Sequence, residues 1–355
     1  MKAELEPLLL QADATVRSAM ECIDRNRSGI ALVVDAQRRL LGTVTDGDIR
    51  RAMLGEVGLD APVGVLLERQ QELNEDRPIP LTAPVGSHPA ELVALMQRYD
   101  VRQIPLVDED DRVQDLALLH ELVDVEGPPL RAVVMAGGFG TRLAPLTEDT
   151  PKPMLPVGDR PLLERIIEQL REAGIRHVNL TTHYRADVIA AHFGDGREHG
   201  VEIEYVPEER PLGTAGALGL VDADGPILVM NGDILTRVDF KAMHRFHDEH
   251  DAEMTIAVRP YEARVPYGLV ELSGSQIVSI AEKPLARGFV NAGIYLLNPD
   301  VCRLVPHGQR FDMPQLIDRL VEAGRRVVGF PLREYWLDVG RLDDYERALA
   351  DVEGL

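Results

Sequence analysis

Residues 131–157 read RAVVMAGGFGTRLAPLTEDTPKPMLPV, and this stretch decides the fold of the larger part of the chain. The apolar run from Ala132 to Met135 leads directly into a glycine loop, which predicts a buried strand followed by an anion-binding turn. Glycine lets backbone N–H groups face a phosphate without interference from Cβ. The candidate nucleotide-binding residues of this loop are Ala136, Gly137, Gly138, Gly140 and Thr141.

Two basic side chains accompany the loop. Arg142 carries a fork of donors that suits phosphate oxygens, and Lys152, held between two prolines, carries a compact charge. The loop does not match two better-known patterns. No Gly-Lys-Ser/Thr follows the glycines, and Leu143 stands where the dinucleotide fingerprint has its third glycine. We therefore predict a polyphosphate site of another kind.

Strands and helices alternate beyond the loop. Apolar runs predict strands at residues 178–181, 201–206 and 227–229, and helices at residues 161–173 and 239–250. This order predicts an α/β fold with a Rossmann-like, mostly parallel sheet and a ligand crevice at the carboxyl ends of its strands.

Two aspartates come from distant strand-like segments. Asp233 follows the apolar run ILVM, and Asp338 lies in the string WLDVG. Two such carboxylates can hold one Mg²⁺ against the phosphates of a nucleotide, while Asp233 alone could simply form a turn after a strand. We expect Trp336, the only tryptophan, to lie in the core.

Composition excludes several classes of partner. The net charge of −21 is spread over both halves of the chain, which argues against nucleic acid and anionic membranes. No run of about 18 apolar residues predicts a membrane span. Cys22 and Cys302 lie far apart and outside any metal motif, so we expect buried thiols and a cytoplasmic protein. His244, His247 and His250 have no metal-binding spacing and are expected to be solvated.

The first 126 residues contain a weak internal repeat. The segments 15–20, 29–35 and 42–50 are echoed by 91–96, 101–108 and 113–122. The region resembles a tandem cystathionine-β-synthase (CBS) pair, the α+β Bateman module. The resemblance implies that Thr45 and Asp48 bind an adenine or guanine nucleotide; the alternative is that they only cap the following helix. Leu118 and Glu121 replace them in the second half, so at most one site is intact.

The string GGFGTRLAPLT, followed by PKPMLP, resembles the opening of the sugar-1-phosphate nucleotidylyltransferases, and later motifs extend the resemblance over residues 130–350. It implies a CBS pair at 1–126, regulatory or used in assembly, and a catalytic domain at 127–355. It further implies that the catalytic residues are Arg142, Lys152, Asp233 and Lys283, that Asp233 also contacts the nucleotide, and that Asp233 and Asp338 hold Mg²⁺. The implied sugar-phosphate residues are Tyr267, Gly268, Glu282, Lys283 and Asn291. The alternative for Glu282 and Lys283 is an exposed ion pair on a hairpin.

The string PLGTAGA resembles family members that use GTP, with Gly213 and Thr214 opening a helix near the base. Glu208 and Glu209 lie just upstream. A carboxylate there could accept hydrogen bonds from N1–H and the 2-amino group of guanine, which adenine does not offer in the same way.

These features together imply Mg²⁺-dependent transfer of a nucleotidyl group from GTP to a sugar-1-phosphate, giving an NDP-sugar and pyrophosphate. The domain order resembles the glucosamine-1-phosphate guanylyltransferases of nonulosonic-acid pathways, which implies glucosamine-1-phosphate as the acceptor. Two alternatives stay open. One is a mannose-, glucose- or heptose-1-phosphate acceptor with another NTP, and the other is a catalytically silent nucleotide sensor. Since CBS modules commonly pair face to face, we expect a homo-oligomer.

Overall fold

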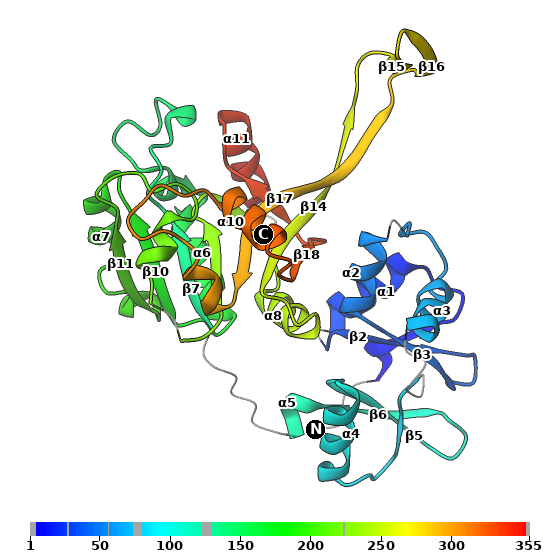
Figure 1. Ribbon diagram of the computed structural model, residues 1–355. Helices are drawn as coiled ribbons and strands as arrows, with labels where there is room; N and C mark the ends of the chain where they lie inside the picture. Colours follow the sequence, from blue (N-terminus) through cyan, green and yellow to red (C-terminus); the bar gives the residue numbers. More distant parts are fainter. Residues whose placement is uncertain are drawn as a thin grey trace. The chain divides into compact units, whose positions relative to one another are not determined.

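The computed structural model describes residues 5–26, 28–55, 57–73, 80–122, 130–222 and 224–352. The chain divides into two compact units, Met1–Gly127 and Pro128–Leu355. Figure 1 draws both units with their elements labelled. The predicted boundary after residue 126 lies outside the described residues.

The N-terminal unit uses one small α+β arrangement twice. Its elements are η1 (Glu6–Leu8), β1 (Leu9–Gln11), α1 (Val16–Asn26), β2 (Ile30–Val34), β3 (Leu40–Thr45), α2 (Asp46–Leu54), α3 (Gly64–Leu73), β4 (Ala83–Pro84), α4 (Pro89–Tyr99), β5 (Gln103–Val107), β6 (Val113–Leu118) and α5 (Leu119–Leu122). In the sheets β1-β2-β3 and β4-β5-β6, the first two strands are parallel and the third is antiparallel. The internal repeat predicted from the sequence is therefore present in the structure.

The two halves of this unit share a core. Leu32 and Val34 of β2 cluster with Leu116 and Leu118 of β6. The connection is also made by the backbone, since the Leu40 N–H donates to the carbonyl of Asp111 at 3.0 Å. The halves thus form one folded body rather than two independent ones.

The C-terminal unit is an α/β domain of three layers. Its elements are β7 (Arg131–Met135), η2 (Thr141–Leu143), η3 (Lys152–Met154), β8 (Pro156–Val157), β9 (Arg160–Pro161), α6 (Leu162–Glu172), β10 (His177–Thr182), α7 (Ala186–Phe193), η4 (Arg197–His199), β11 (Glu202–Pro207), η5 (Gly216–Leu220), β12 (Ile227–Asn231), β13 (Ile234–Thr236), α8 (Phe240–Glu249), β14 (Met254–Arg264), β15 (Leu269–Ser273), β16 (Gln276–Ala281), β17 (Leu285–Leu297), α9 (Pro299–Cys302), α10 (Met313–Glu322), β18 (Val327–Pro331), β19 (Trp336–Asp338) and α11 (Leu342–Asp351).

The central sheet has the strand order β11-β10-β7-β12-β17-β14-β18. Only β17 runs antiparallel to its neighbours, β12 and β14, so the mostly parallel sheet is confirmed. Ala132 of β7 lies opposite Val178 of β10 and Leu228 of β12. The strands β10, β11 and β12 contain the three predicted apolar runs, apart from Val201 just before β11.

Alternating side chains of the sheet pack into two helical layers. Ala132 and Val134 face the core made with α6, α7 and α8. Val133, between them, faces the opposite core made with η5, α9 and α10. Cys302 lies in this second core, and burial raises the pKa of its thiol to about 11. Cys22 is also buried and free, so both cysteines are the buried thiols expected from the sequence.

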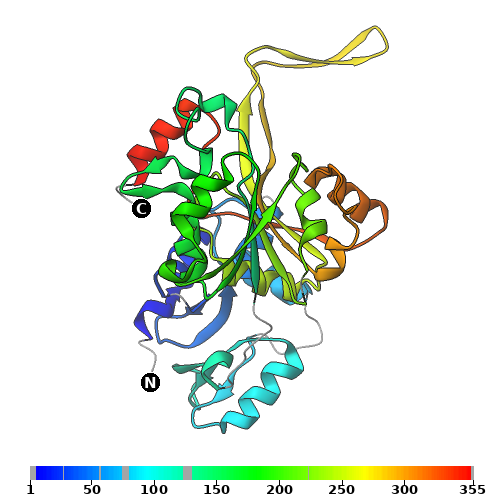
Figure 2. The ribbon, with the colours of Figure 1, turned by 90° about the vertical axis from the view of Figure 1, so that its left-hand side faces the viewer.

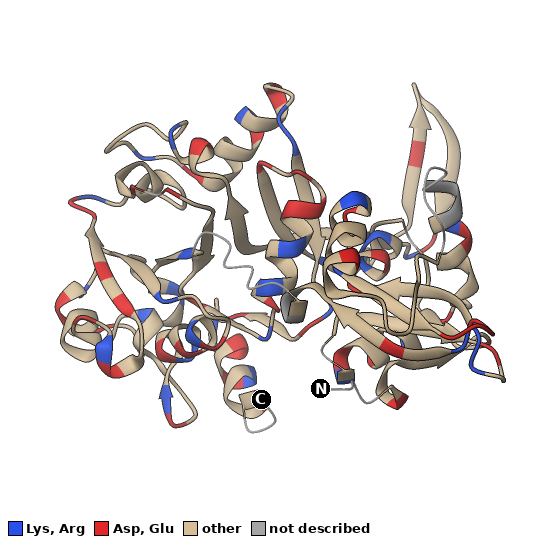
Figure 3. Cartoon of the chain, turned by 90° about the horizontal axis from the view of Figure 1, so that it is seen from below, with Lys and Arg blue, Asp and Glu red and all other residues tan. Residues whose placement is uncertain are grey.

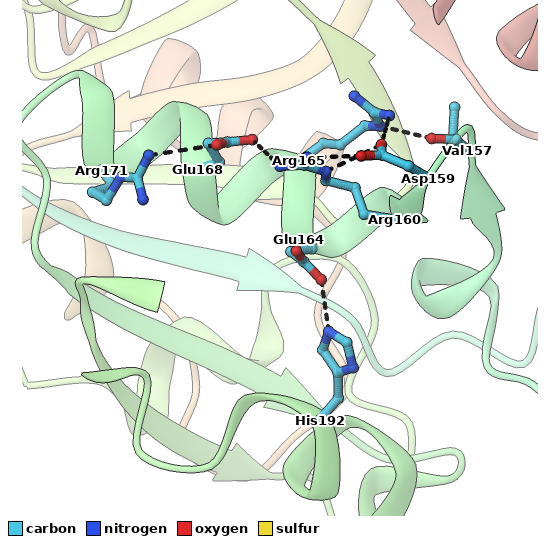
Figure 4. A network of polar contacts seen from close by, with 8 residues as sticks. All are labelled: Val157, Asp159, Arg160, Glu164, Arg165, Glu168, Arg171 and His192. Atoms are coloured by element: carbon cyan, nitrogen blue, oxygen red, sulfur yellow. Dashed lines mark hydrogen bonds and ion pairs between the residues drawn. The ribbon is translucent and has the colours of Figure 1, made fainter. Parts of the chain in front are cut away.

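Ion pairs on the outer face of α6 hold the β8–β9 hairpin in place (Figure 4). The Arg165 guanidinium donates to the Val157 carbonyl at 2.7 Å and to Asp159 at 2.8 Å. Arg160 pairs with Asp159 and with Glu168, and His192 of α7 contacts Glu164 at 2.8 Å. Because η3 directly precedes this hairpin, the network also anchors the segment that carries Lys152.

Basic and acidic residues both occur along the backbone of the two units (Figure 3). Within the described residues, no helix is long and apolar enough to cross a bilayer.

Two strands continue beyond the sheet as a long ribbon, which we call the arm and define as residues 261–289. It comprises the outer ends of β14 and β17, paired from Tyr261 opposite Gly288 to Arg264 opposite Leu285, and the hairpin β15–β16. The arm projects away from its own sheet in both views (Figures 1 and 2). All of its residues are exposed except Ala263, Val265 and Pro284, which are half-buried.

Candidate active site

The loops after β7 and β12 lie at the same edge of the sheet as the end of β10. The Ala136 N–H, after β7, donates to the Thr181 carbonyl of β10 at 3.0 Å. The Gly232 N–H, after β12, donates to the Met135 carbonyl at 2.9 Å. The crevice was predicted at this edge, and both the glycine loop and Asp233 follow strands that end here.

The glycine loop lies directly against the segment of Lys152. Gly140 has a φ of +66°, and a Cβ at this position would lie 2.9 Å from Cβ of Lys152 and 3.0 Å from Cγ2 of Thr147. The Thr147 hydroxyl donates to the Gly140 carbonyl at 2.9 Å. Glycine is therefore required here by both backbone conformation and space. Gly138 and Thr141 are exposed on the same loop, whereas Ala136 is buried beneath it.

Lys152 and Asp233 form an ion pair at the base of the loop. Lys152 is buried, with 7% of its surface exposed. One oxygen of Asp233, Oδ2, accepts from the Lys152 ammonium, whereas Oδ1 is buried without a hydrogen-bond partner in the described part of the chain. A buried carboxylate oxygen without a donor is costly, and this one is available to a cation.

Asp338 approaches Asp233 through the two-stranded sheet β13–β19. Ile234 lies opposite Asp338, and the Val339 N–H donates to the Asp233 carbonyl at 3.0 Å. Desolvation raises the pKa of Asp338, and the negative charge of Asp233 raises it further, while the positive charges of Lys152 and Arg142 lower it. The two predicted metal ligands are therefore brought together, although they lie about a hundred positions apart in the sequence.

Arg142 completes this group of charges. It lies on η2, and its Nη1 comes within 3.7 Å of the place that a Cβ on Gly340 would occupy. Two cations and two carboxylates thus face the end of the glycine loop. The described residues contain no cluster of three or more His, Cys, Asp or Glu that could hold a metal. An ion on Asp233 and Asp338 would need water and phosphate ligands as well, which is the usual coordination of Mg²⁺.

A pocket of about 430 Å³ opens beside Asp338. Of the predicted site residues, it is lined by Thr214, Asn291 and Asp338. The complete lining is Thr214, Asn231, Ile234, Asn291, Ala292, Gly293, Tyr295, Asp312, Met313, Pro314, Trp336 and Asp338. None of these lining residues is Lys or Arg.

Trp336 is half-buried and packs against the main core, in keeping with the expected core position, and it also lines the pocket. Its Nε1–H donates to the Ala292 carbonyl at 2.8 Å. The adjacent Tyr295 is buried, which raises the pKa of its hydroxyl, and it hydrogen-bonds Asn291. The position of Trp336 depends on the pairing of β19 with β13, which no local pattern encodes.

Asp312 is a pocket residue that the sequence interpretation missed. Its Oδ1 accepts from the Thr214 N–H at 3.1 Å, and the Thr214 hydroxyl accepts from the Met313 N–H at 2.8 Å. Gly213 has a φ of +79°, and a Cβ there would overlap Asp312. The available signal was the string Asp-Met-Pro, typical of a helix start. The segment after Thr214 forms the short 3-10 helix η5 rather than a longer helix.

Glu208 has a structural contact of its own. Its Oε2 accepts from the Leu212 N–H at 2.8 Å, and its Oε1 would lie 3.2 Å from a Cβ on Gly137. The carboxylate therefore links the glycine loop to the segment that carries Gly213 and Thr214. Glu209 is exposed.

Four predicted sugar-phosphate residues lie on the arm. Tyr267 and Gly268 precede β15, and Glu282 and Lys283 follow β16. The two pairs are neighbours, since Glu282 Oε2 would lie 3.1 Å from a Cβ on Gly268. The structure does not bring them to Asn291, because the strand from Leu285 to Asn291 alone spans about 20 Å at about 3.3 Å per residue. Their roles stay predictions.

In the N-terminal unit, Thr45 and Asp48 form a capping box at the start of α2. The Asp48 carboxylate accepts from the Thr45 N–H at 2.8 Å, the Thr45 hydroxyl at 2.7 Å and the Gln70 amide at 2.6 Å. The capping alternative is therefore observed. A nucleotide at this corner stays a prediction, and it would have to exchange these contacts for its own.

The burial of His247 corrects an expectation from the sequence. Only 2% of its surface is exposed, although we expected it to be solvated. Its Nε2 lies 3.2 Å from Asn298 Oδ1, and its Nδ1 lies 2.8 Å from the Thr255 hydroxyl. Burial lowers the pKa of this imidazole. His244 and His250 of the same segment are half-buried.

Comparison with known proteins identifies the family to which the chain belongs. Residues 131–354 match the profile of the nucleotidyl transferase family, and residues 3–55 match that of the CBS domain. The chain therefore belongs to the nucleotidyl transferase family. The fold resembles the crystal structure of a putative glucose-1-phosphate thymidylyltransferase from Bacillus anthracis, determined in complex with sucrose. Its TM-score is 0.52 at 24% identity, over 64% of this chain and 96% of that one.

Two curated relatives are informative. The mannose-1-phosphate guanylyltransferase of Mycobacterium tuberculosis is 36% identical over 234 residues, which is 62% of this chain and 64% of that protein. The D-glycero-alpha-D-manno-heptose 1-phosphate guanylyltransferase of Aneurinibacillus thermoaerophilus is 31% identical over 228 residues, 63% of this chain and 99% of that protein. The chain thus spans less than two thirds of the length of the first relative.

Proposed function

We propose that this protein is a sugar-1-phosphate guanylyltransferase, which transfers a guanylyl group from GTP to a sugar-1-phosphate and releases pyrophosphate. The observation that carries the proposal is the cluster of Arg142, Lys152, Asp233 and Asp338 at the end of the glycine loop. It combines two cations of the kind that suits phosphate with two carboxylates close enough for the charge of Asp233 to raise the pKa of Asp338. The names of both curated relatives support the guanylyl group.

The residues fit a divalent cation, because Asp233 has a buried oxygen without a donor and Asp338 lies beside it. Asp233 and Asp338 would hold Mg²⁺. When bound, it would neutralise charge on the phosphates that react. The Lys152 ammonium fixes the orientation of the Asp233 carboxylate.

In the proposed reaction, an anionic oxygen of the sugar phosphate forms a bond to the α-phosphorus of GTP. The bond from that phosphorus to the bridging oxygen breaks, and pyrophosphate leaves with the electron pair. The substrate oxygen is already an anion, so no side chain has to remove a proton. The chain's own residues position the two substrates and stabilise charge: the loop amides and Arg142 on the leaving pyrophosphate, and Asn291 on the sugar.

The acceptor is the finer part of the proposal. The sequence resemblance points to glucosamine-1-phosphate, whereas the relatives are named for mannose and for a heptose. The test is pyrophosphate release with Mg²⁺ across four NTPs and the 1-phosphates of glucosamine, mannose, glucose and the heptose. We expect turnover with GTP and one acceptor, a GDP-sugar in the mass spectrum, and loss of turnover in EDTA.

Absence of turnover across this panel, in protein that is folded and binds GTP, would support the catalytically silent sensor instead. A preference for another NTP would refute the guanylyl assignment alone. For the base, we propose that Glu209 contacts guanine, since the Glu208 carboxylate already accepts from Leu212. Glu209→Gln should reduce the preference for GTP over ATP, and an unchanged preference would refute this contact.

We also propose that the N-terminal unit binds an adenine or guanine nucleotide at Thr45 and Asp48. The support is the match to the CBS domain and the position of both residues at a helix start. Calorimetric titration with AMP, ATP and GMP tests it, and binding that survives Asp48→Ala would exclude this site. The proposal places the protein in the cytoplasm, in keeping with its two free, buried thiols.

A further inference from the structure

Trp336 forms part of the wall of the pocket. Along β19, Trp336 and Asp338 line the pocket, whereas Leu337 between them lies in a hydrophobic cluster on the other side. This alternation is that of a regular strand. The only tryptophan of the chain therefore lies on the same side of β19 as the proposed metal ligand.

The carbonyl of Trp336 has no donor on the paired strand β13. In an antiparallel pair, hydrogen-bonded positions alternate with positions that face away from the partner strand. The Arg237 N–H donates to the Tyr335 carbonyl at 3.0 Å, which makes Tyr335 a hydrogen-bonded position. Trp336, the next residue, lies opposite Thr236 at a position that is not hydrogen-bonded. Its carbonyl therefore needs a donor from another element.

Arg259 on β14 is that donor. Its Nη1 donates to the Trp336 carbonyl at 2.5 Å, and its Cζ lies 5.5 Å from the centroid of the Trp336 ring. The second distance is within the range of a cation–π interaction. The guanidinium thus contacts both the backbone and the indole of one residue. The indole is also fixed at its other polar point, because its Nε1–H donates to the Ala292 carbonyl.

The polar contacts of the Arg259 side chain are all with Trp336. Arg259 is half-buried, and within the described residues its guanidinium forms no ion pair with a carboxylate. Acidic residues outnumber basic ones by 59 to 38 in this chain, so the lack of an acidic partner does not reflect scarcity. Partial burial of a charge is costly unless other groups compensate for it. The carbonyl and the ring of Trp336 provide that compensation.

We propose that Arg259 is a positioning residue for the acceptor, because it fixes the indole of Trp336 as the surface on which the ring of the sugar-1-phosphate packs. Arg259 does not itself line the pocket, so it acts through Trp336 and not on the substrate. GTP should not depend on it, since the glycine loop and Lys152 lie on other elements. This inference rests on the proposed function, since it concerns the wall of the same acceptor pocket.

The fluorescence of Trp336 tests the contact without any substrate, because the chain has no other tryptophan. Arg259→Met keeps an unbranched side chain but removes the guanidinium. We expect acrylamide to quench the emission of this variant more strongly than that of the wild type, and the steady-state anisotropy to fall, because the indole gains freedom and exposure. Quenching and anisotropy equal to those of the wild type would overturn the inference.

Steady-state kinetics separate the acceptor from the nucleotide. In Arg259→Met, the KM for the sugar-1-phosphate should rise about tenfold, the effect of losing one hydrogen bond from a charged group, while the KM for GTP stays at the wild-type value. Arg259→Lys keeps the charge and a donor but not the flat guanidinium, so its quenching and its acceptor KM should lie between those of the wild type and Arg259→Met. An equal rise in both KM values would contradict a role confined to the acceptor.

Arg326→Met is the matched control. The Arg326 guanidinium also donates to a backbone carbonyl, that of His250, at 2.9 Å. It precedes β18, whose first residue lies opposite Met254 at the start of β14, away from the pocket. This variant should match the wild type in quenching, anisotropy and acceptor KM, and the same changes in it would indicate a general loss of stability and overturn the inference. A wild type that turns over no acceptor, with the indole still freed in Arg259→Met, would count against the proposed function alone.

Discussion

Replacing either carboxylate of the proposed metal site by its amide should abolish activity, but only one replacement should cost stability. In Asp233→Asn, the ammonium of Lys152 loses its charged partner in a position where only 9% of the lysine side chain and 24% of the aspartate side chain are exposed. Breaking a buried ion pair costs about 3 to 5 kcal/mol. We expect the lower end, about 3 kcal/mol, because the amide oxygen still accepts a hydrogen bond.

Asp338→Asn should behave differently. The carboxyl of Asp338 has its pKa raised by desolvation and by the charge of Asp233, so its negative charge is disfavoured in the folded protein. Removing that charge relieves repulsion between the two aspartates. We expect its effect on the free energy of unfolding to stay below about 1 kcal/mol, of either sign. Both variants should lose at least about 100-fold in turnover, or about 2.7 kcal/mol of transition-state stabilisation.

The assay is urea unfolding followed by the fluorescence of Trp336. This residue is the only tryptophan, so its fluorescence reports on the C-terminal unit alone. It is run in EDTA and again with Mg²⁺. Added Mg²⁺ should stabilise the wild type but neither variant, because a ligand stabilises only the state that binds it. Equal destabilisation by the two substitutions would refute the electrostatic reasoning, and near-wild-type turnover in either would remove that residue from the metal site.

Three further predictions follow from local geometry. Gly140→Ala forces a Cβ against Lys152 at a φ of +66°, so it should lower the free energy of unfolding by about 1 to 2 kcal/mol and also lower turnover, whereas Gly138→Ala, with open space around it, should leave the free energy of unfolding unchanged. Equal stability of the two variants in urea would show that the loop adapts. Burial lowers the pKa of His247 below the 6.5 of the unfolded chain. The contribution of this residue to the free energy of unfolding should therefore be fully present above pH 6.5 and fall as the pH drops below that value. The urea midpoints at pH 7.5 and 5.5 should differ less in His247→Gln than in the wild type. Thr45→Ala removes the capping box of α2 and should destabilise the N-terminal unit by about 1 kcal/mol, measured by thermal unfolding, while leaving basal turnover unchanged.

The sequence alone was sufficient to predict the elements that local patterns determine. The buried runs at 178–181 and 227–229 lie within β10 and β12, and the glycine loop follows β7 as expected. Apolar periodicity and turn residues determine such segments on their own. The meeting of Asp233 with the glycine loop also followed from the sequence, because both come directly after parallel strands, whose carboxyl ends share one edge of a sheet. The grouping of Lys152 and Asp338 with them followed only from the family resemblance.

Features that depend on contacts between distant segments of the chain could not be predicted from local sequence patterns. Asp312 reaches Thr214 across 98 positions, and Trp336 reaches the pocket only because β19 pairs with β13. His247 is buried because Thr255 and Asn298, on other elements, provide its partners. The projection of the arm could not be predicted, because motifs such as Tyr-Gly and Glu-Lys-Pro resemble functional motifs of the family but do not indicate the direction in which a ribbon extends.

The position of β17 in the sheet determines how long β12 lacks one of its neighbours while the chain is synthesised on the ribosome. β12 is complete at Asn231, but its neighbour β17, which also pairs with β14, is complete only at Leu297. At about 5 to 20 residues per second, β12 remains an unpaired sheet edge for on the order of 3 to 13 s. During that interval the nascent chain presents the apolar run of β12 to other chains and to chaperones, and a chain interrupted between these two points would be prone to aggregate.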